Sequence, residues 1–161
     1  MTPRARISFQ SPDRPAPVLL VSPCGDDHDV LPGILEHPHW EWHRTKSCRQ
    51  ALRVLSNHAI AVLICERDLP DGSWRNLLDA AMKLSAPPNL IVCSRLADDW
   101  LWAEVLNLGG YDLLIKPFDR EEVSRVVFLA WNSWKRRRER DAASRPAETA
   151  IAAGAAWASV A

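Results

Sequence analysis

The sequence predicts a single α/β domain in which five parallel strands alternate with five helices, in a doubly wound (βα)5 arrangement. Short apolar runs such as 60–65 are aliphatic and β-branched, which is typical of strands buried on both faces. Segments with apolar residues at helical spacing, such as 47–58, follow these runs. Parallel neighbours need a crossover, and the helices supply it. With 161 residues, 47% of them apolar, the chain is long enough for one hydrophobic core.

The individual elements follow from apolar runs, capping residues and turn residues. Strands are expected over 18–21, 39–45, 60–65, 89–93 and 113–115. Helices are expected near Asp26 and Asp27, over 47–58, 73–84 and 98–108, and from Asp119 onward. In the fourth helix the expected inward stripe is Leu101, Val105 and Leu108. Gly109-Gly110 ends that helix.

Charge and composition divide the chain into three parts. Residues 1–16 are rich in proline and arginine and are expected to form a flexible leader. The domain is expected over 17–134, and 135–161 reads as a basic helix extension with an Ala-rich tail. Four cysteines without C-x-x-C spacing, and no signal peptide, are typical of reduced thiols in a cytoplasmic protein. No apolar stretch approaches the ~20 residues of a membrane helix.

The candidate site lies where the third strand ends at Glu66. Five strands with helices on both faces favour the strand order 2-1-3-4-5, whose switch point lies between strands one and three. That order brings the ends of these strands, Ser22 and Glu66, side by side. In open α/β sheets, sites are built at this carboxyl edge.

Three further pieces carry a family resemblance. They are Leu-Pro-Asp-Gly at 69–72, a hydroxyl residue, Ser94, at the end of strand four, and the run from Gly109 to Phe118, which contains Lys116-Pro117. With these pieces the chain resembles the receiver domain of two-component response regulators, which implies a flavodoxin-like fold and a place in phosphorelay signalling. The resemblance covers about 17–134.

The resemblance assigns a role to each position and shows where this chain departs from the pattern. Glu66 stands where the family has a phospho-accepting aspartate. Ser22 and Pro23 stand where two acidic residues hold a magnesium ion. Leu113 stands where an aromatic residue turns inward on activation. Phosphate-contacting positions of the family are matched here by Ser94 and Lys116.

These departures predict an atypical receiver, or pseudo-receiver, that uses no cofactor and is not an enzyme. A serine and a proline offer few hard oxygen ligands, so the Mg²⁺ site is expected to be lost. Asp26 and Asp27 are better explained as helix caps than as replacement ligands. Glu66 reaches one methylene further than aspartate, so it can present a permanent charge to Lys116 in partial imitation of a phosphate. The alternative for this pair is a structural ion pair that only holds the loops together.

The expected function is interaction with a signalling protein: a histidine kinase, a phosphotransfer protein or an output protein. Helix four, strand five and helix five often form the partner or homodimer surface in the family, and Trp100 and Trp131 are the candidate interface residues. Trp102 is expected in the core. Membrane binding is not expected. Too few residues follow the basic run for a DNA-binding module, so nucleic acid is not an expected partner.

Two rival functions stay open at this point. The first is an active phospho-receiver with an unusual metal site. The second is an unrelated small enzyme on a flavodoxin-like fold, although no phosphate-cradling glycine-rich loop or Ser-His pair is evident.

Overall fold

The computed structural model describes residues 15–158. The leader predicted over 1–16 therefore falls almost wholly outside the described residues, as does the end of the predicted tail, 159–161. The five strands of the main sheet are β1 (Ala16–Val21), β2 (Trp40–Thr45), β3 (Val62–Glu66), β6 (Asn89–Ser94) and β7 (Asp112–Ile115). A small hairpin is formed by β4 (Asp68–Leu69) and β5 (Gly72–Ser73). The helices are α1 (Gly25–Ile34), α2 (Cys48–Asn57), α3 (Trp74–Met82), α4 (Asp99–Leu108) and α5 (Arg120–Ala158).

The sheet is parallel throughout, in the order β2-β1-β3-β6-β7. Because β6 and β7 are the fourth and fifth strands of this sheet, the predicted order 2-1-3-4-5 and the doubly wound fold class are confirmed. In the register, Val21 lies beside Cys65 and Glu66 lies beside Cys93. The ends of β1 and β3 are therefore neighbours, as the topology required.

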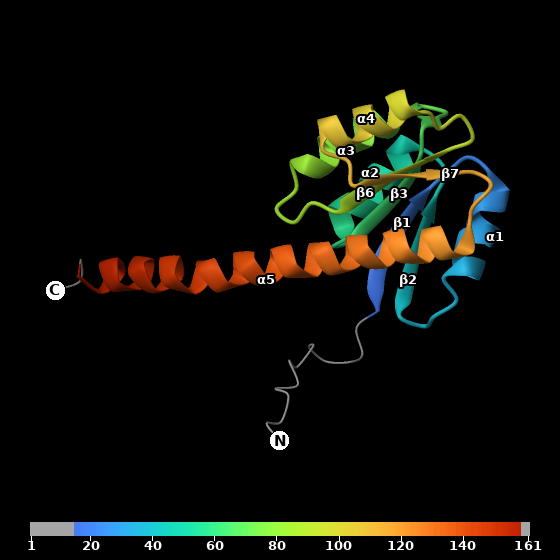
Figure 1. The fold of residues 1–161 in the computed structure, drawn as a ribbon. Coiled ribbons are helices and arrows are strands. Elements are labelled where there is room, and N and C mark those ends of the chain that lie inside the picture. The colour runs from blue at the N-terminus through green and yellow to red at the C-terminus, as the bar shows by residue number, and fades with distance from the viewer. Residues whose placement is uncertain (1–14, 159–161) are drawn as a thin grey trace, which may run out of the picture.

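Helices cover both faces of the sheet and divide the core in two (Figure 1). On one face, α2, α3 and α4 bury side chains such as Leu55, Leu77 and Val105 against the sheet. On the other face, α1 and α5 bury Leu31 and Val127. Both faces of the central strands are thus buried, which explains why the sequences of β3 and β6 are nearly continuous apolar runs.

Polar side chains set where the helices begin. Ser47 accepts the N–H of Gln50 at 3.3 Å at the start of α2, and Asp98 accepts the N–H of Leu101 at 2.8 Å at the start of α4. The α4 helix ends at Gly109, whose φ of 105° favours glycine. These caps agree with the sequence-based expectations.

An aspartate of the Leu-Pro-Asp-Gly turn fixes the start of α2 from across the loop. The Asp71 carboxylate accepts the backbone N–H groups of Cys48 at 2.7 Å and Arg49 at 2.9 Å. These two bonds, first that from Arg49 and then that from Cys48, lower the pKa of Asp71. The turn after β3 is thereby tied to the helix that packs beside it.

The base of the long α5 helix is fastened to the domain, and the rest projects away from it (Figure 1). Asn89 donates to the carbonyl oxygen of Ala130 at 2.8 Å and accepts from Arg137 at 3.2 Å. The Arg137 guanidinium also donates to the carbonyl oxygen of Pro87 at 2.5 Å. Part of the basic run therefore holds the helix against the sheet.

Tryptophans on α5 and α4 lie differently from the prediction. Trp131 is only 8% exposed and stacks on Trp134, so its predicted place at a partner surface is wrong. Trp102 is 50% exposed, so its predicted place in the core is wrong as well. Trp102 follows the buried Leu101 by one residue, a rotation of about 100° that carries its side chain off the inward stripe. Leu108, predicted in that stripe, is also exposed at the end of the helix.

A buried lysine between two carboxylates

Three charged side chains converge at the carboxyl edge of the sheet. Glu66 is the last residue of β3, Lys116 follows β7 directly, and Asp27 lies in the first turn of α1. The Lys116 ammonium group forms ion pairs with Asp27 Oδ2 and with Glu66 Oε2. The side chains of Lys116 and Asp27 are each 7% exposed, and that of Glu66 is 18% exposed. The predicted meeting of Glu66 and Lys116 is therefore present, with a second carboxylate in addition.

The two carboxylates keep Lys116 charged inside the protein. Burial by itself lowers the pKa of a lysine, since it penalises the charged form. Here the hydrogen bonds to Asp27 and Glu66 outweigh burial and raise the pKa of Lys116 above its usual value. Lys116 is therefore a charged ammonium group in the folded protein.

Asp27 was expected to cap a helix, and the structure gives it a different position. Residue 24 is the N-cap of α1 and makes no side-chain capping bond, while the Asp27 side chain turns into the site. The Ser22 hydroxyl donates to Asp27 Oδ2 at 2.6 Å and accepts the N–H of Cys24 at 3.1 Å. Asp26, one residue earlier, is exposed. The cap interpretation of Asp27 is therefore wrong.

The other positions implied by the resemblance are placed as follows. Pro23 is exposed. Ser94 is buried, and its hydroxyl accepts the N–H of Leu96 at 3.1 Å. The carbonyl oxygen of Ser94 accepts the backbone N–H of Lys116 at 3.0 Å, so β6 positions the lysine through the main chain. Leu113 is buried in the core under α4.

A thiol and an aromatic ring lie near the three charged groups. The Cys93 thiol lies 3.9 Å from Glu66 Oε2, and the Lys116 ammonium lies 5.9 Å from the centre of the Phe118 ring. Burial, followed by the nearby Glu66 charge, raises the pKa of Cys93 well above its usual range. Cys93 is therefore a protonated thiol, unsuited to act as a nucleophile.

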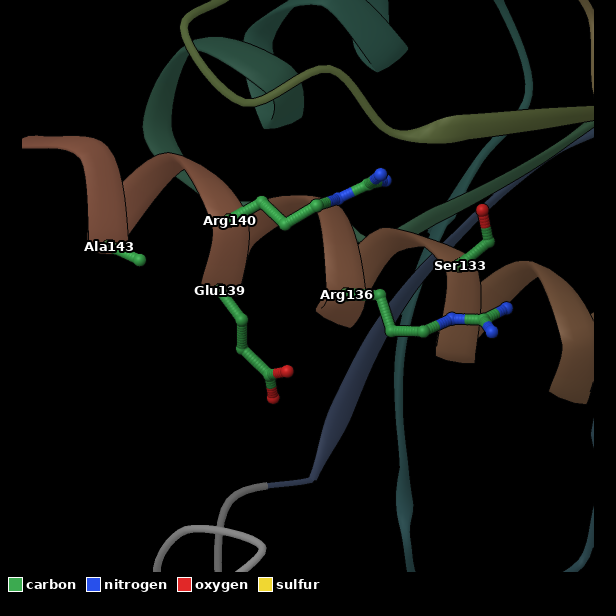
Figure 2. A pocket seen from close by; sticks show the side chains of 5 residues that line it. All are labelled: Ser133, Arg136, Glu139, Arg140 and Ala143. Carbon is green, nitrogen blue, oxygen red and sulfur yellow. The ribbon is translucent and has the colours of Figure 1, made fainter.

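Two further features lie on the surface of the molecule. On α4 and β7 several large apolar side chains are exposed: Trp100 (86%), Trp102 (50%), Leu106 (38%) and Ile115 (50%). On the α5 helix an open hollow of about 480 Å³ is lined by Ser133, Arg136, Glu139, Arg140 and Ala143 (Figure 2). The hollow mixes both signs of charge, and its residues come from the helix alone.

Comparison with solved structures identifies the fold class. The signal receiver domain of an HD domain-containing protein from Pseudomonas fluorescens Pf-5 matches with a TM-score of 0.74 at 24% identity, over 83% of this chain and 99% of that one. A CheY-like response regulator receiver domain protein from Methanospirillum hungatei JF-1 matches with a TM-score of 0.68 at 20% identity, over 76% and 98%. The beryllofluoride-activated NtrC4 receiver domain dimer gives 0.68 at 23% identity, over 73% and 98%.

These neighbours share one architecture, so the chain has the fold of response regulator receiver domains. No protein-family model matches the sequence. No curated protein matches it either. Within residues 15–158, no helix is both long enough and apolar enough to cross a membrane.

Proposed function

We propose that the protein is an atypical receiver domain that acts in phosphorelay signalling through protein–protein contacts, without accepting a phosphoryl group and without enzymatic activity. The observation that carries this proposal is the ion pair between Lys116 and Glu66, the residue at the phospho-acceptor position. In a receiver that turns over phosphate, the lysine must be available to a transient phosphoryl group. Here a permanent carboxylate engages it, supported by Asp27.

The chemistry of the remaining positions supports the same conclusion. An acyl phosphate concentrates negative charge, which hard cations with oxygen ligands normally offset. Ser22 offers only a neutral hydroxyl, already bonded to Asp27 and Cys24, and Pro23 offers no side-chain donor or acceptor. Leu113, at the position of the moving aromatic residue, is buried in the core. With an aliphatic residue there, the usual relay has no moving part, which fits a partner surface with one state and also the alternative that the ion pair is only structural.

Exposure to a small phosphodonor tests the proposal directly. The full chain is incubated with acetyl phosphate and Mg²⁺ and examined by intact-mass spectrometry, and in parallel with beryllofluoride and Mg²⁺ while tryptophan fluorescence is followed. We expect no mass gain and no fluorescence change. The NtrC4 receiver domain, which is activated by beryllofluoride, serves as the positive control. A phosphoryl adduct, on Glu66 or on another acid, would establish the rival reading of an active receiver.

We place the contact surface on α4, β7 and α5, the equivalents of helix four, strand five and helix five. Trp102 and Ile115 present apolar area there, in the way that interfaces do, and Trp100 lies on the same helix. A homodimer through this face is the simplest assembly, and the NtrC4 neighbour is itself described as a dimer. A kinase, phosphotransfer or output protein in the cytoplasm is the proposed heterologous partner.

Sedimentation equilibrium distinguishes a charge that sets the surface from an ion pair that only stabilises the loops. If the carboxylate at position 66 sets the state, Glu66→Gln should weaken self-association several-fold while Glu66→Asp retains it. Trp102→Ala should weaken it in both interpretations. Equal association constants for wild type, Glu66→Gln and Glu66→Asp would leave only the structural role for the pair.

A further inference from the structure

We propose that the Lys116 ammonium is itself the resident cation of this site, so that the folded chain has no place for a divalent ion until that ammonium is removed. This inference rests on the proposed function and deepens it, because it names what replaces the metal. Asp27 is the residue that makes the replacement complete. Neither the family motifs nor the strand ends in the sequence predicted that Asp27 would pair with Lys116.

The geometry places the ammonium between the two carboxylates. Asp27 Oδ2 arrives from α1, Glu66 Oε2 arrives from β3, and both are paired with Lys116 Nζ. The centre of the Phe118 ring lies 5.9 Å from the same nitrogen atom. Since the lysine and aspartate side chains are each 7% exposed, bulk water has little access to this cation. The Lys116 ammonium, which is part of the chain, thus occupies the position from which a metal ion would contact both carboxylates.

The donor set is also poor for the ion that the fold suggests. Mg²⁺ needs near-octahedral oxygen coordination at about 2.0–2.1 Å and retains several waters. The Ser22 hydroxyl is already bonded to Asp27 and Cys24, and Pro23 is exposed and carries no ligand atom. Among the described residues, no group of three or more His, Cys, Asp or Glu side chains is placed to hold a metal ion. Mg²⁺ could enter only by displacing Lys116 from both carboxylates.

Charge decides what happens when the lysine is removed. Two carboxylates facing one ammonium leave a single net negative charge at the edge of the sheet. Without the ammonium, two largely buried carboxylates face each other with no counterion, which strongly favours uptake of a small divalent cation or of protons. Lys116→Met removes the charge and keeps the apolar length of the side chain. This variant should therefore acquire a metal site that the natural chain does not have.

Manganese binding to the full chain tests the proposal, with Mn²⁺ measured by electron paramagnetic resonance of the free ion near neutral pH. The natural protein should bind Mn²⁺ no better than the Asp27→Asn/Glu66→Gln/Lys116→Met triple variant, in which both acids and the lysine are neutral. Lys116→Met should bind at least about tenfold more tightly than either. Lys116→Arg, which keeps a positive charge, is the matched control and should resemble the natural protein.

Protection against thermal unfolding gives a second readout for a variant that folds poorly. Lys116→Met should gain stability on addition of Mn²⁺, whereas the natural protein and Lys116→Arg should not. Three results would overturn the proposal: Mn²⁺ binding by the natural chain that Asp27→Asn abolishes, a folded Lys116→Met with no added affinity even at about pH 8, where protons compete less with the metal, or a Lys116→Met that stays unfolded in Mn²⁺ while the triple variant folds. The first result would also undermine the proposed function. The other two would leave it standing.

Discussion

Asp27→Asn is the substitution that tests the buried charge cluster most directly. Asparagine has nearly the shape of aspartate but cannot serve as a counterion for Lys116. The variant therefore leaves a buried ammonium with Glu66 as its remaining partner, and it weakens the short bond from Ser22. We expect a clear loss of stability with the fold retained.

The size of the loss follows from burial. Removing one partner of a buried ion pair costs about 3–5 kcal/mol when the other charge is left without compensation. Because Glu66 still compensates Lys116, we expect about 2–3 kcal/mol for Asp27→Asn. Glu66 is more exposed than Asp27, 18% against 7%, so Glu66→Gln should cost less, about 1–2 kcal/mol.

Urea unfolding followed by tryptophan fluorescence measures both losses. With a slope of about 1.5–2 kcal/mol per molar urea, Asp27→Asn should lower the midpoint by about 1–2 M without changing the slope. Asp26→Asn is the matched control, because Asp26 is exposed in the same turn of α1, and it should leave the midpoint nearly unchanged. A loss for Asp27→Asn no larger than that of this control would refute the argument that Asp27 is a counterion of Lys116.

Two further predictions concern the loop after β3 and the thiols. Because the Asp71 carboxylate has a lowered pKa in the folded chain, its contribution to stability is present above about pH 4 and is lost as the pH falls through its folded value. Urea midpoints of wild type and Asp71→Asn should therefore differ near neutral pH and converge in acid, with exposed Asp79→Asn as the control; a constant difference would contradict this. Burial raises the pKa of Cys48 to about 11, and Cys65 and Cys93 are also buried with raised pKa values, so only half-buried Cys24 should react readily with a thiol reagent in the folded protein. A second fast thiol before unfolding would argue against it.

Strand ends and helix caps could be predicted because they depend on local signals, whereas the strand order followed from the fold class. The run that ends at Glu66 and the run before Lys116 mark strand ends, and parallel strands bring their carboxyl ends to one edge. Ser47 and Asp98 announce helix starts by their residue type. Each of these inferences needs only a few neighbouring residues. Because β6 lies between β3 and β7, the meeting of Glu66 and Lys116 did not follow from these signals and was expected from the family resemblance.

The role of Asp27 was not accessible, because two adjacent aspartates differ only in the direction that one helical turn gives them. Asp26 and Asp27 are chemically identical, and successive residues of a helix point about 100° apart. A shift of one residue in the start of α1 would therefore direct Asp26, and not Asp27, toward the site. For Trp131 a signal did exist. Trp131 and Trp134 follow the inward Val127 at spacings of four and seven residues, which continues the buried stripe.

The fastening of α5 has a consequence for whatever the far half of that helix carries. The α5 helix is continuous. It starts after the loop that follows Lys116, crosses the face of the sheet that α1 also covers, passes the contact between Asn89 and Arg137, and extends beyond the domain. The contact between Arg137 and Asn89 therefore fixes the rotation of α5 about its own axis. Inserting a single residue after Arg137 would turn every downstream side chain by about 100° and advance it by about 1.5 Å. The number of residues between Arg137 and a downstream position therefore determines the direction in which the domain presents that position.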